Sequence, residues 1–233
     1  MSKKLLPEDT VIIWNAHPLG KYRDFLYNAM GKEFIDSKGD MGAWLFSHAG
    51  KTLKEVVVEL GNGYQAKSME ELMLEKRFDV ISGAEKAFIV AFDKEMNELG
   101  YDCGNIIGSG ICWGLFMIVY GKTGTKSRPC AARIYIKDDG AVTLRLFLNK
   151  VDKHRDHIEN APVHIKDAFK FKGNDCKSCN TACAPGKMYT IDGKTMHKCN
   201  HATFYFNKPS LEKLPDYVAL LSKFYPTKKT KQT

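Results

Sequence analysis

The chain has 233 residues, of which 44% are hydrophobic, and a formal net charge of +8. This length allows one large domain or two small ones with a proper core. No apolar run reaches the roughly 18 to 20 residues of a membrane-crossing helix, and the first ten residues lack the apolar segment of a signal peptide. We therefore expect a cytoplasmic protein that does not use a membrane as a partner.

Most of the excess positive charge lies in the last third of the chain. Residues 151–233 contain 15 Lys and Arg against 8 Asp and Glu, net +7, whereas residues 1–150 have a net charge of +1. Such a bias favours an anionic partner, either a nucleic acid, a phosphate-bearing metabolite or an acidic protein. Because the lysines are scattered and do not form a stripe, a soluble lysine-rich surface explains the same bias. Both interpretations stay open.

The first hundred residues are predicted to be mainly helical. A short β-rich stretch over 10–14 leads into a turn, and apolar residues at helical spacing predict a helix over 22–34. Residues 54–60 fit a helix or a strand. Ser68 and Ser82 each precede a Glu by three positions, which is the capping-box pattern that begins a helix.

The middle of the chain is predicted to form an antiparallel sheet. Residues 111–120 are apolar on both alternating faces, as in a central strand. The glycine-rich, basic stretch over 121–127 lacks the spacing of a Walker A motif, so we expect a hairpin loop there. A second hairpin is expected at residues 138–140, because a three-residue loop pairs Ile134 with Leu144 and keeps one face apolar.

The other face of this second hairpin carries the candidate ligand site. The same register places Arg133 opposite Arg145, and directly opposed like charges destabilise a sheet unless an anion, a ligand or an acidic side chain offsets them. Alternatively, both arginines extend to water or pair with acids from residues 152–159. The candidate anion-binding residues, including those of the basic loop, are Arg133, Tyr135, Arg145, Phe147, Lys122, Lys126 and Arg128.

A helix predicted over 151–160 supplies most of the candidates for an enzyme. It carries His154, His157 and Glu159, and Cys130 lies earlier in the chain. The surrounding charged residues are typical of a solvated helix face. No nucleophile, base and orienting group can be placed together from spacing, so the sequence leans towards a binding protein.

The segment richest in metal ligands lies between a short helix predicted over 162–169 and a strand predicted over 203–206. Its first three cysteines follow C-x2-C-x3-C spacing, and two histidines flank the fourth. Four sulfur ligands are typical of a structural zinc site. The candidate zinc ligands are Cys176, Cys179, Cys183 and Cys199, with His197 or His201 as substitutes.

The dipeptide Asp192-Gly193 predicts a type I′ hairpin between these cysteines. Counting back across the turn pairs Lys187 with Lys198. The chain that follows Cys183 and the chain that precedes Cys199 are therefore expected to meet at the open end of the hairpin, away from the turn. A filled four-ligand site has no open position for a substrate, so zinc is expected to stabilise the fold. Two disulfides, unrelated buried thiols or an iron-sulfur cluster are the alternatives.

The fold class expected from these elements is α+β, with helices packed on an antiparallel sheet and a C-terminal metal-binding β-hairpin. A closing helix is predicted over 211–224. The expected regions are a mainly helical part over 1–105, a sheet part over 106–225 that includes the cysteine hairpin at 170–202, and a flexible basic tail over 226–233. One compact domain is the alternative.

The segments YGKTGTKSRPCAARIYI and LRLFLNKVDKHRDHIENAP, followed by C-x2-C and YTIDGKTMHKCN, resemble a group of uncharacterised bacterial cytosolic proteins. These share a central β-hairpin, an IEnAP-like helix and a cysteine-bearing hairpin of zinc-knuckle type near the C-terminus. The likeness covers roughly the last 125 residues. It implies a cytosolic, metal-stabilised protein and no established activity.

The function expected from the sequence is a binding or regulatory module for an anionic small molecule. The first alternative is a nucleic-acid-binding protein that uses its basic last third, and the second is an enzyme of unknown class. Binding that weakens steeply with salt and ignores small ligands would favour nucleic acid.

Overall fold

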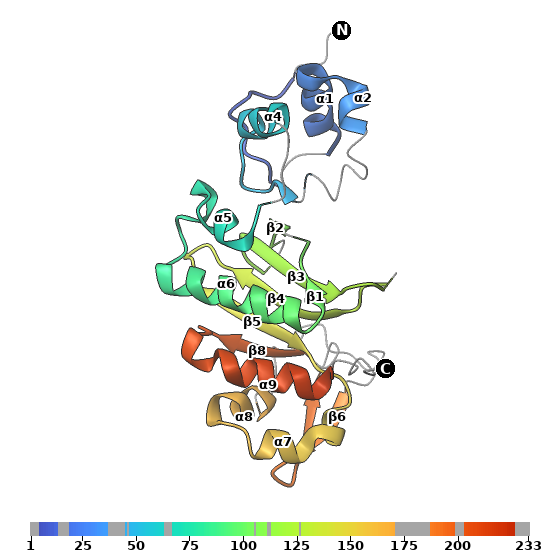
Figure 1. Ribbon diagram of the computed structural model, residues 1–233, viewed down its shortest axis with the longest axis vertical. Coiled ribbons are helices and arrows are strands. Elements are labelled where there is room, and N and C mark those ends of the chain that lie inside the picture. Colours follow the sequence, from blue (N-terminus) through green and yellow to red (C-terminus); the bar gives the residue numbers. More distant parts are fainter. Residues whose placement is uncertain are drawn as a thin grey trace, which may run out of the picture. The chain divides into compact units, whose positions relative to one another are not determined.

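The computed structural model describes residues 5–13, 19–36, 45, 47–62, 67–104, 106–110, 113–125, 127–170, 187–198 and 203–226. They form an α+β fold in which helices accompany an antiparallel sheet, as expected (Figure 1). The chain divides into two compact units. Unit 1 consists of Met1–Ser82, Cys103–Ile118 and Tyr135–Ala141, and unit 2 of Gly83–Asp102, Val119–Ile134 and Val142–Thr233. The expected boundary at residue 105 stays a prediction.

In the described part of unit 1, helices near the N-terminus surround a small apolar core. These are α1 (Leu19–Met30), α2 (Lys32–Asp36) and α4 (Leu53–Gly61). The helix predicted over 22–34 is interrupted because Gly31 has a positive φ of 87°, a conformation that glycine adopts readily. The buried core residues are Ile12, Tyr22, Leu26, Ile35, Leu45, Leu53, Val56 and Leu60.

The described residues of the β-rich stretch over 10–14 form an isolated bridge, between Val11 and Thr52, and Trp14 lies outside the described residues. The Ile12 amide donates to the carbonyl oxygen of Lys51 at 2.8 Å, and the buried Tyr22 hydroxyl accepts a bond from the Ile13 amide at 3.0 Å. These bonds fix the extended segment beside the start of α4.

Two helix starts in unit 1 have complete capping boxes. Thr52 caps α4 with Glu55, and Ser68 caps α5 (Met69–Met73) with Glu71, which confirms the prediction at Ser68. A short 3-10 helix, η1 (Lys76–Phe78), follows. Residues 54–60, whose sequence fits either a helix or a strand, are helical and belong to α4.

The main sheet has the strand order β1-β3-β4-β5-β8, and β2 pairs with β3. Of the strand predicted over 111–120, residues 116–120 lie in β3, and residues 111 and 112 lie outside the described residues. The Gly110 amide donates to the Leu115 carbonyl between β2 and β3. The strands are β1 (Tyr101–Asp102), β2 (Ile107–Ser109), β3 (Phe116–Lys122), β4 (Cys130–Ile136), β5 (Val142–Phe147) and β8 (Thr203–Asn207).

The predicted hairpin between β4 and β5 is confirmed. The Lys137 amide donates to the Ala141 carbonyl at 3.0 Å across a three-residue loop, and Gly140 has a positive φ of 80°. Ile134 and Leu144, which the register places on one face, are both fully buried. The alternation of apolar and polar residues was therefore a correct guide to the register.

Two helices of unit 2 cover the apolar face of this sheet. They are α6 (Gly83–Glu98) and α9 (Leu214–Phe224), which lie side by side in Figure 1. The ring centroids of Phe88 in α6 and Tyr217 in α9 are 6.2 Å apart, and those of Phe206 in β8 and Tyr217 are 5.0 Å apart. The opposite face of β5 and β8 carries the polar side chains described below.

A second, two-stranded sheet belongs to unit 2. Strands β6 (Lys187–Ile191) and β7 (Lys194–Lys198) pair as predicted, with Lys187 opposite Lys198. Asp192 and Gly193 have φ values of 48° and 70°, as a type I′ turn requires. The other helical elements of unit 2 are η2 (Val151–His154), α7 (Arg155–Glu159), α8 (Val163–Lys170) and η3 (Leu211–Lys213), of which η2 and α7 contact β6.

None of the helices in the described part of the chain has the length and apolar character that a bilayer crossing requires.

Candidate functional site

The polar face of β5 and β8 brings together several of the predicted ligand-binding residues. Arg145 lies opposite Tyr205, and Phe147 lies opposite Thr203. The guanidinium carbon of Arg145 is 5.0 Å from the ring centroid of Phe147 and 5.0 Å from that of Tyr205. Arg145 is only 7% exposed, and its Nη2 donates to Thr203 Oγ1 at 3.4 Å. Its positive charge is therefore held between two aromatic rings.

Arg133 of β4 approaches the same ring. Its guanidinium carbon is 5.2 Å from the centroid of Phe147. Two cations therefore share one aromatic side chain, as the predicted opposition of Arg133 and Arg145 suggested. We call the set of Arg133, Arg145, Phe147, Thr203 and Tyr205 the arginine face.

The thiol of Cys130 lies in the field of both arginines. Burial raises the pKa of Cys130 above its ordinary value, and the opposing effects of Arg133 and Arg145 do not cancel this increase. The thiolate is the nucleophilic form of cysteine, and a raised pKa makes it scarce at neutral pH. The environment of Cys130 therefore argues against a catalytic role.

Three other predicted ligand-binding residues make different contacts. The Lys122 ammonium lies 4.5 Å from the ring centroid of Tyr101, and Arg128 forms an ion pair with Asp102, so both brace strand β1. Tyr135 belongs to unit 1, where its ring centroid is 5.8 Å from that of Trp113. The seventh predicted residue, Lys126, lies outside the described residues.

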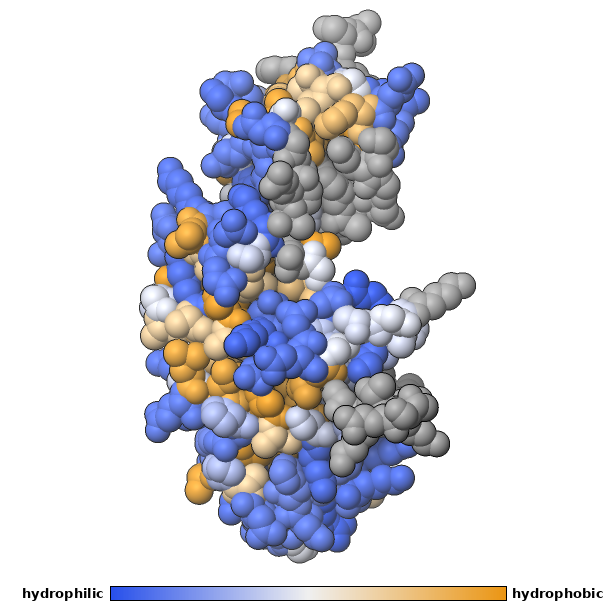
Figure 2. Space-filling model, viewed as in Figure 1, coloured by the Kyte–Doolittle hydropathy of each residue, from blue (hydrophilic) through white to orange (hydrophobic). Residues whose placement is uncertain are grey.

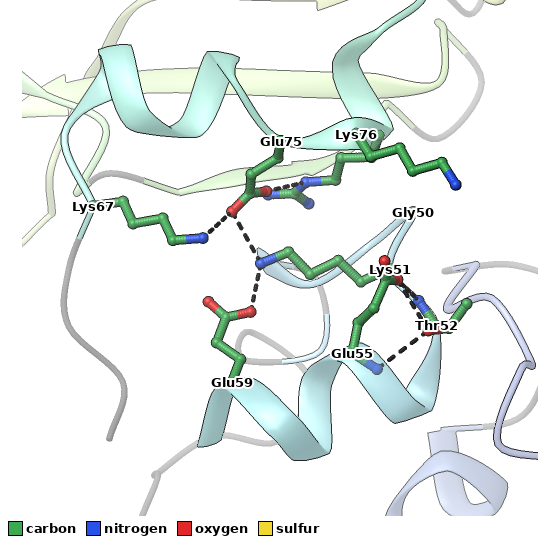
Figure 3. Close-up of a pocket in the computed structure, with 9 residues that line it drawn as sticks. Gly50, Lys51, Thr52, Glu55, Glu59, Lys67, Glu75 and Lys76 are labelled. Carbon is green, nitrogen blue, oxygen red and sulfur yellow. Dashed lines mark hydrogen bonds and ion pairs between the residues drawn. The ribbon is translucent and has the colours of Figure 1, made fainter. Parts of the chain in front are cut away.

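A charged pocket of about 470 Å³ in unit 1 was not predicted from the sequence (Figure 3). It lies among α4, the segment before α5 and η1. Its contacts join residues that are far apart in the chain, so no local spacing pattern in the sequence predicts this pocket. The lining residues are Gly50, Lys51, Thr52, Glu55, Glu59, Lys67, Glu75, Lys76 and Arg77.

An ion-pair network centred on Glu75 forms the wall of this charged pocket. Lys51 Nζ lies 2.7 Å from Glu59 Oε2 and 3.2 Å from Glu75 Oε1, and Lys67 Nζ lies 2.7 Å from the same Oε1. Arg77 Nε donates to Glu75 Oε2 at 2.7 Å. Burial alone would raise the pKa of Glu75, but Arg77, Lys67 and Lys51 together lower it below its usual value.

Comparison with protein-family models, with curated proteins and with solved structures finds no match for this chain. The chemistry of the chain's own residues therefore carries any functional assignment.

The predicted zinc ligands lie outside the described residues. This holds for the four cysteines and His201, and for the side chain of His197, so the zinc site stays a prediction. Within the described ranges, no three His, Cys, Asp or Glu side chains are grouped to hold a metal ion.

An aromatic cluster lies beside three of the described positions that border the cysteine segments. The ring centroid of Phe169 is 4.1 Å from that of Phe204 and 6.3 Å from that of Tyr189, whose hydroxyl donates to the Phe169 carbonyl. These residues lie one or two positions from Lys170, Thr203 and Lys187, where the described chain borders the cysteine segments. The cluster therefore holds these three borders close together.

The turn of the β6–β7 hairpin is held by acidic and basic side chains from η2 and α7. Asp152 Oδ1 accepts a bond from the Thr190 amide at 2.9 Å, and Arg155 Nε donates to the Thr190 carbonyl at 3.0 Å. Glu159 Oε1 accepts a bond from the Asp192 amide at 2.8 Å. Glu159, an enzyme candidate in the sequence, is therefore occupied in positioning the hairpin.

His154, another enzyme candidate, packs against the closing helix. Its ring centroid is 4.2 Å from that of Phe224. Burial, and secondarily the charge of Lys223, lowers the pKa of His154. Hydrophilic side chains cover the neighbouring α7 in Figure 2, as the sequence predicted for a solvated helix. Neither observation places a nucleophile beside this histidine.

We expect His154 to make the protein less stable in mild acid. Since its pKa is lower in the folded state, the unfolded chain binds the proton first as the pH falls below about 6.5, and the free energy of unfolding decreases until the folded-state pKa is passed. His154→Phe keeps an aromatic contact and cannot titrate. Urea unfolding at pH 7.5 and 5.0 should show a smaller pH difference for this variant, and an unchanged difference would show that His154 is not responsible.

Proposed function

We propose that the protein binds a small carboxylate-bearing molecule at the arginine face. One observation carries this proposal: two guanidinium groups lie within 5.2 Å of the centre of one phenylalanine ring. Two positive charges beside one ring make this surface cationic, and a cationic surface attracts an anionic ligand. The sequence led us to expect an anionic small molecule, and the proposal narrows this to a carboxylate. It keeps three of the seven predicted residues, Arg133, Arg145 and Phe147, and adds Thr203 and Tyr205.

The chemistry of the arginine face favours a planar carboxylate. A guanidinium group presents paired N–H donors whose spacing matches the two oxygens of a carboxylate. The rings of Phe147 and Tyr205 next to Arg145 offer flat apolar surfaces on which an unsaturated or aromatic ligand can stack. The burial of Arg145 also favours a small ligand over nucleic acid, whose phosphates are contacted mainly by exposed basic side chains.

We further propose that zinc supports the unit that carries this face. The spacing of Cys176, Cys179, Cys183 and Cys199 is typical of structural zinc sites. The aromatic cluster adds support, because it holds close together three positions from which the cysteine segments start. In this proposal zinc stabilises the fold and takes no part in a reaction.

Benzoate is a suitable first probe of the arginine face, with benzamide as its neutral isostere. Isothermal titration should detect binding of benzoate and none of benzamide. Arg145→Met keeps an apolar side chain of similar length and removes the charge, so we expect the Kd for benzoate to rise roughly tenfold or more. Lys153→Met, at an exposed position of η2, is the matched control and should bind as the parent does.

The alternatives give different results in the same experiment. Equal benzoate affinity in the parent and in a folded Arg145→Met variant would contradict the arginine face as the binding site. Binding of a DNA duplex that weakens steeply with salt, with no response to benzoate, would favour the nucleic-acid function instead.

A further inference from the structure

The two outer edges of the β6–β7 hairpin differ in the groups that their backbones meet. In a two-residue hairpin the pair next to the turn, Ile191 and Lys194, is hydrogen-bonded across the strands, and bonded and non-bonded pairs then alternate along the ladder. The amide and carbonyl groups of the next pair, Thr190 and Thr195, therefore point away from the hairpin, each towards one outer edge.

The outer edge of β6 is closed by side chains. The Thr190 amide donates to Asp152 Oδ1 at 2.9 Å, and the Thr190 carbonyl accepts a bond from Arg155 Nε at 3.0 Å. These side chains come from η2 and α7, and both elements contact β6, which lies beside α7 in Figure 1. Because both backbone groups of Thr190 are already bonded, an extended segment cannot pair with this edge there.

The outer edge of β7 has no such cover among the residues that the structure describes. Thr195 is exposed, and no described group forms a hydrogen bond with its amide or its carbonyl. The backbone of His197, two positions further, points to the same side by the same alternation. An edge strand with outward donors and acceptors is a template to which an extended chain can add as a further strand.

The charge of the β6–β7 hairpin indicates which kind of chain would add. The hairpin contains three lysines and one aspartate, and this aspartate pairs with Lys170 at 2.6 Å. Because successive residues of a strand alternate between its faces, the positions of Lys194, Met196 and Lys198 share one face of β7. Acidic residues of an added strand directly opposite the two lysines would form favourable cross-strand pairs.

A second copy of the chain fits this edge less well than an acidic segment. Antiparallel self-pairing through the outward groups of Thr195 and His197 centres on Met196. It sets Lys194 of one copy opposite Lys198 of the other. Directly opposed like charges destabilise a sheet, and lysines on an edge strand are a common protection against pairing between copies. The charge of the edge therefore favours an acidic partner.

We propose that the outer edge of β7 binds an extended acidic segment of another protein as a third, antiparallel strand. The backbone of this segment bonds that of Thr195 and His197, and its acidic residues, four positions apart, lie opposite Lys194 and Lys198. The residue midway between them is apolar and lies opposite the half-buried Met196. This surface is separate from the arginine face and does not depend on the function proposed there.

The peptide TETVTET, labelled with a fluorophore, tests this proposal by fluorescence polarisation. We expect it to bind, the neutral peptide TQTVTQT to bind more weakly, and the basic peptide TKTVTKT to bind weakest. Thr195→Pro removes the outward amide and leaves the bonds within the hairpin, because proline is tolerated on an edge strand where the N–H faces solvent. The Kd for TETVTET should rise about tenfold or more.

Further variants separate the backbone contact from the charge. Thr195→Val keeps the amide and should retain binding, because the contact runs through the backbone. Lys194→Met should raise the Kd for TETVTET roughly two- to fivefold, as expected for an exposed ion pair. Lys153→Met, at an exposed position of η2, is the matched lysine control and should leave the Kd unchanged. Thermal unfolding checks that each variant remains folded.

Lys194→Glu provides a test that needs no proline in the strand. It should weaken binding of TETVTET and strengthen binding of TETVTKT, whose lysine antiparallel pairing sets opposite the substituted position. An unchanged order of these two peptides would overturn the proposal. So would absence of TETVTET binding to the parent, or equal binding by the parent and a folded Thr195→Pro variant. A dimer in sedimentation velocity that Thr195→Pro dissociates would assign the edge to a second copy and also overturn it.

Discussion

Replacing Cys179 with Ser is expected to lower the free energy of unfolding by several kcal/mol. If zinc is bound by the four cysteines, its binding free energy is part of the folding free energy, and removal of one thiolate weakens both together. The effect should appear as a lower denaturant midpoint in urea unfolding followed by circular dichroism. It should be largest in unit 2, to which all four cysteines belong.

A chelator separates zinc from a simple packing effect. EDTA should destabilise the parent protein and have little further effect on Cys179→Ser, because both changes remove the same ion. Cys103→Ala is the matched control, as Cys103 is a buried thiol of unit 1 outside the cysteine segments, and its response to EDTA should equal that of the parent. Unchanged melting of Cys179→Ser would end the zinc proposal.

Glu75→Gln is expected to destabilise the protein by about 3 kcal/mol, because it leaves buried cations without their shared carboxylate. The Glu75 side chain is 11% exposed and is bonded by Lys51, Lys67 and Arg77. A glutamine fills the same volume but carries no charge. Chemical unfolding of the two proteins at pH 7 measures the difference directly.

The pH dependence of this effect has a defined sign. The pKa of Glu75 is lowered in the folded state, so its contribution is fully present above the ordinary carboxyl pKa and is lost as the pH falls through the lower, folded-state pKa. The parent should therefore approach Glu75→Gln in stability below about pH 4. Glu98→Gln, at the exposed end of α6, should show neither effect. Equal stability of Glu75→Gln and the parent at pH 7 would show that the network contributes nothing.

Local turn chemistry explains why the two hairpins could be predicted correctly. The type I′ turn predicted at Asp192-Gly193 requires a positive φ at both residues, and both have one. A three-residue loop at 138–140 is predicted because its register keeps one face of the hairpin apolar, and Ile134 and Leu144 on that face are buried. Capping at Ser68 is similarly local, since its partner Glu71 lies three residues away. Turns, hairpin registers and helix caps can be predicted from the sequence because they depend on residues that are close together in the chain.

Features that depend on distant residues could not be predicted. The charged pocket joins Lys51, Glu59 and Glu75, and no spacing rule links these three positions. The opposition of Arg133 and Arg145 followed from the hairpin register, but the role of Tyr205 did not, because the pairing of β5 with β8 spans some sixty residues. The engagement of Arg128 with Asp102 likewise depends on the packing of β1.

Native mass spectrometry of the protein purified without added metal tests the central claim, that a zinc-supported unit binds a small anion, most directly. The account predicts a mass equal to the 26.3 kDa chain plus one zinc ion, and a small anionic molecule that is released on collisional activation. A folded protein whose mass is that of the chain alone, and which acquires neither zinc nor benzoate when they are added, would contradict it.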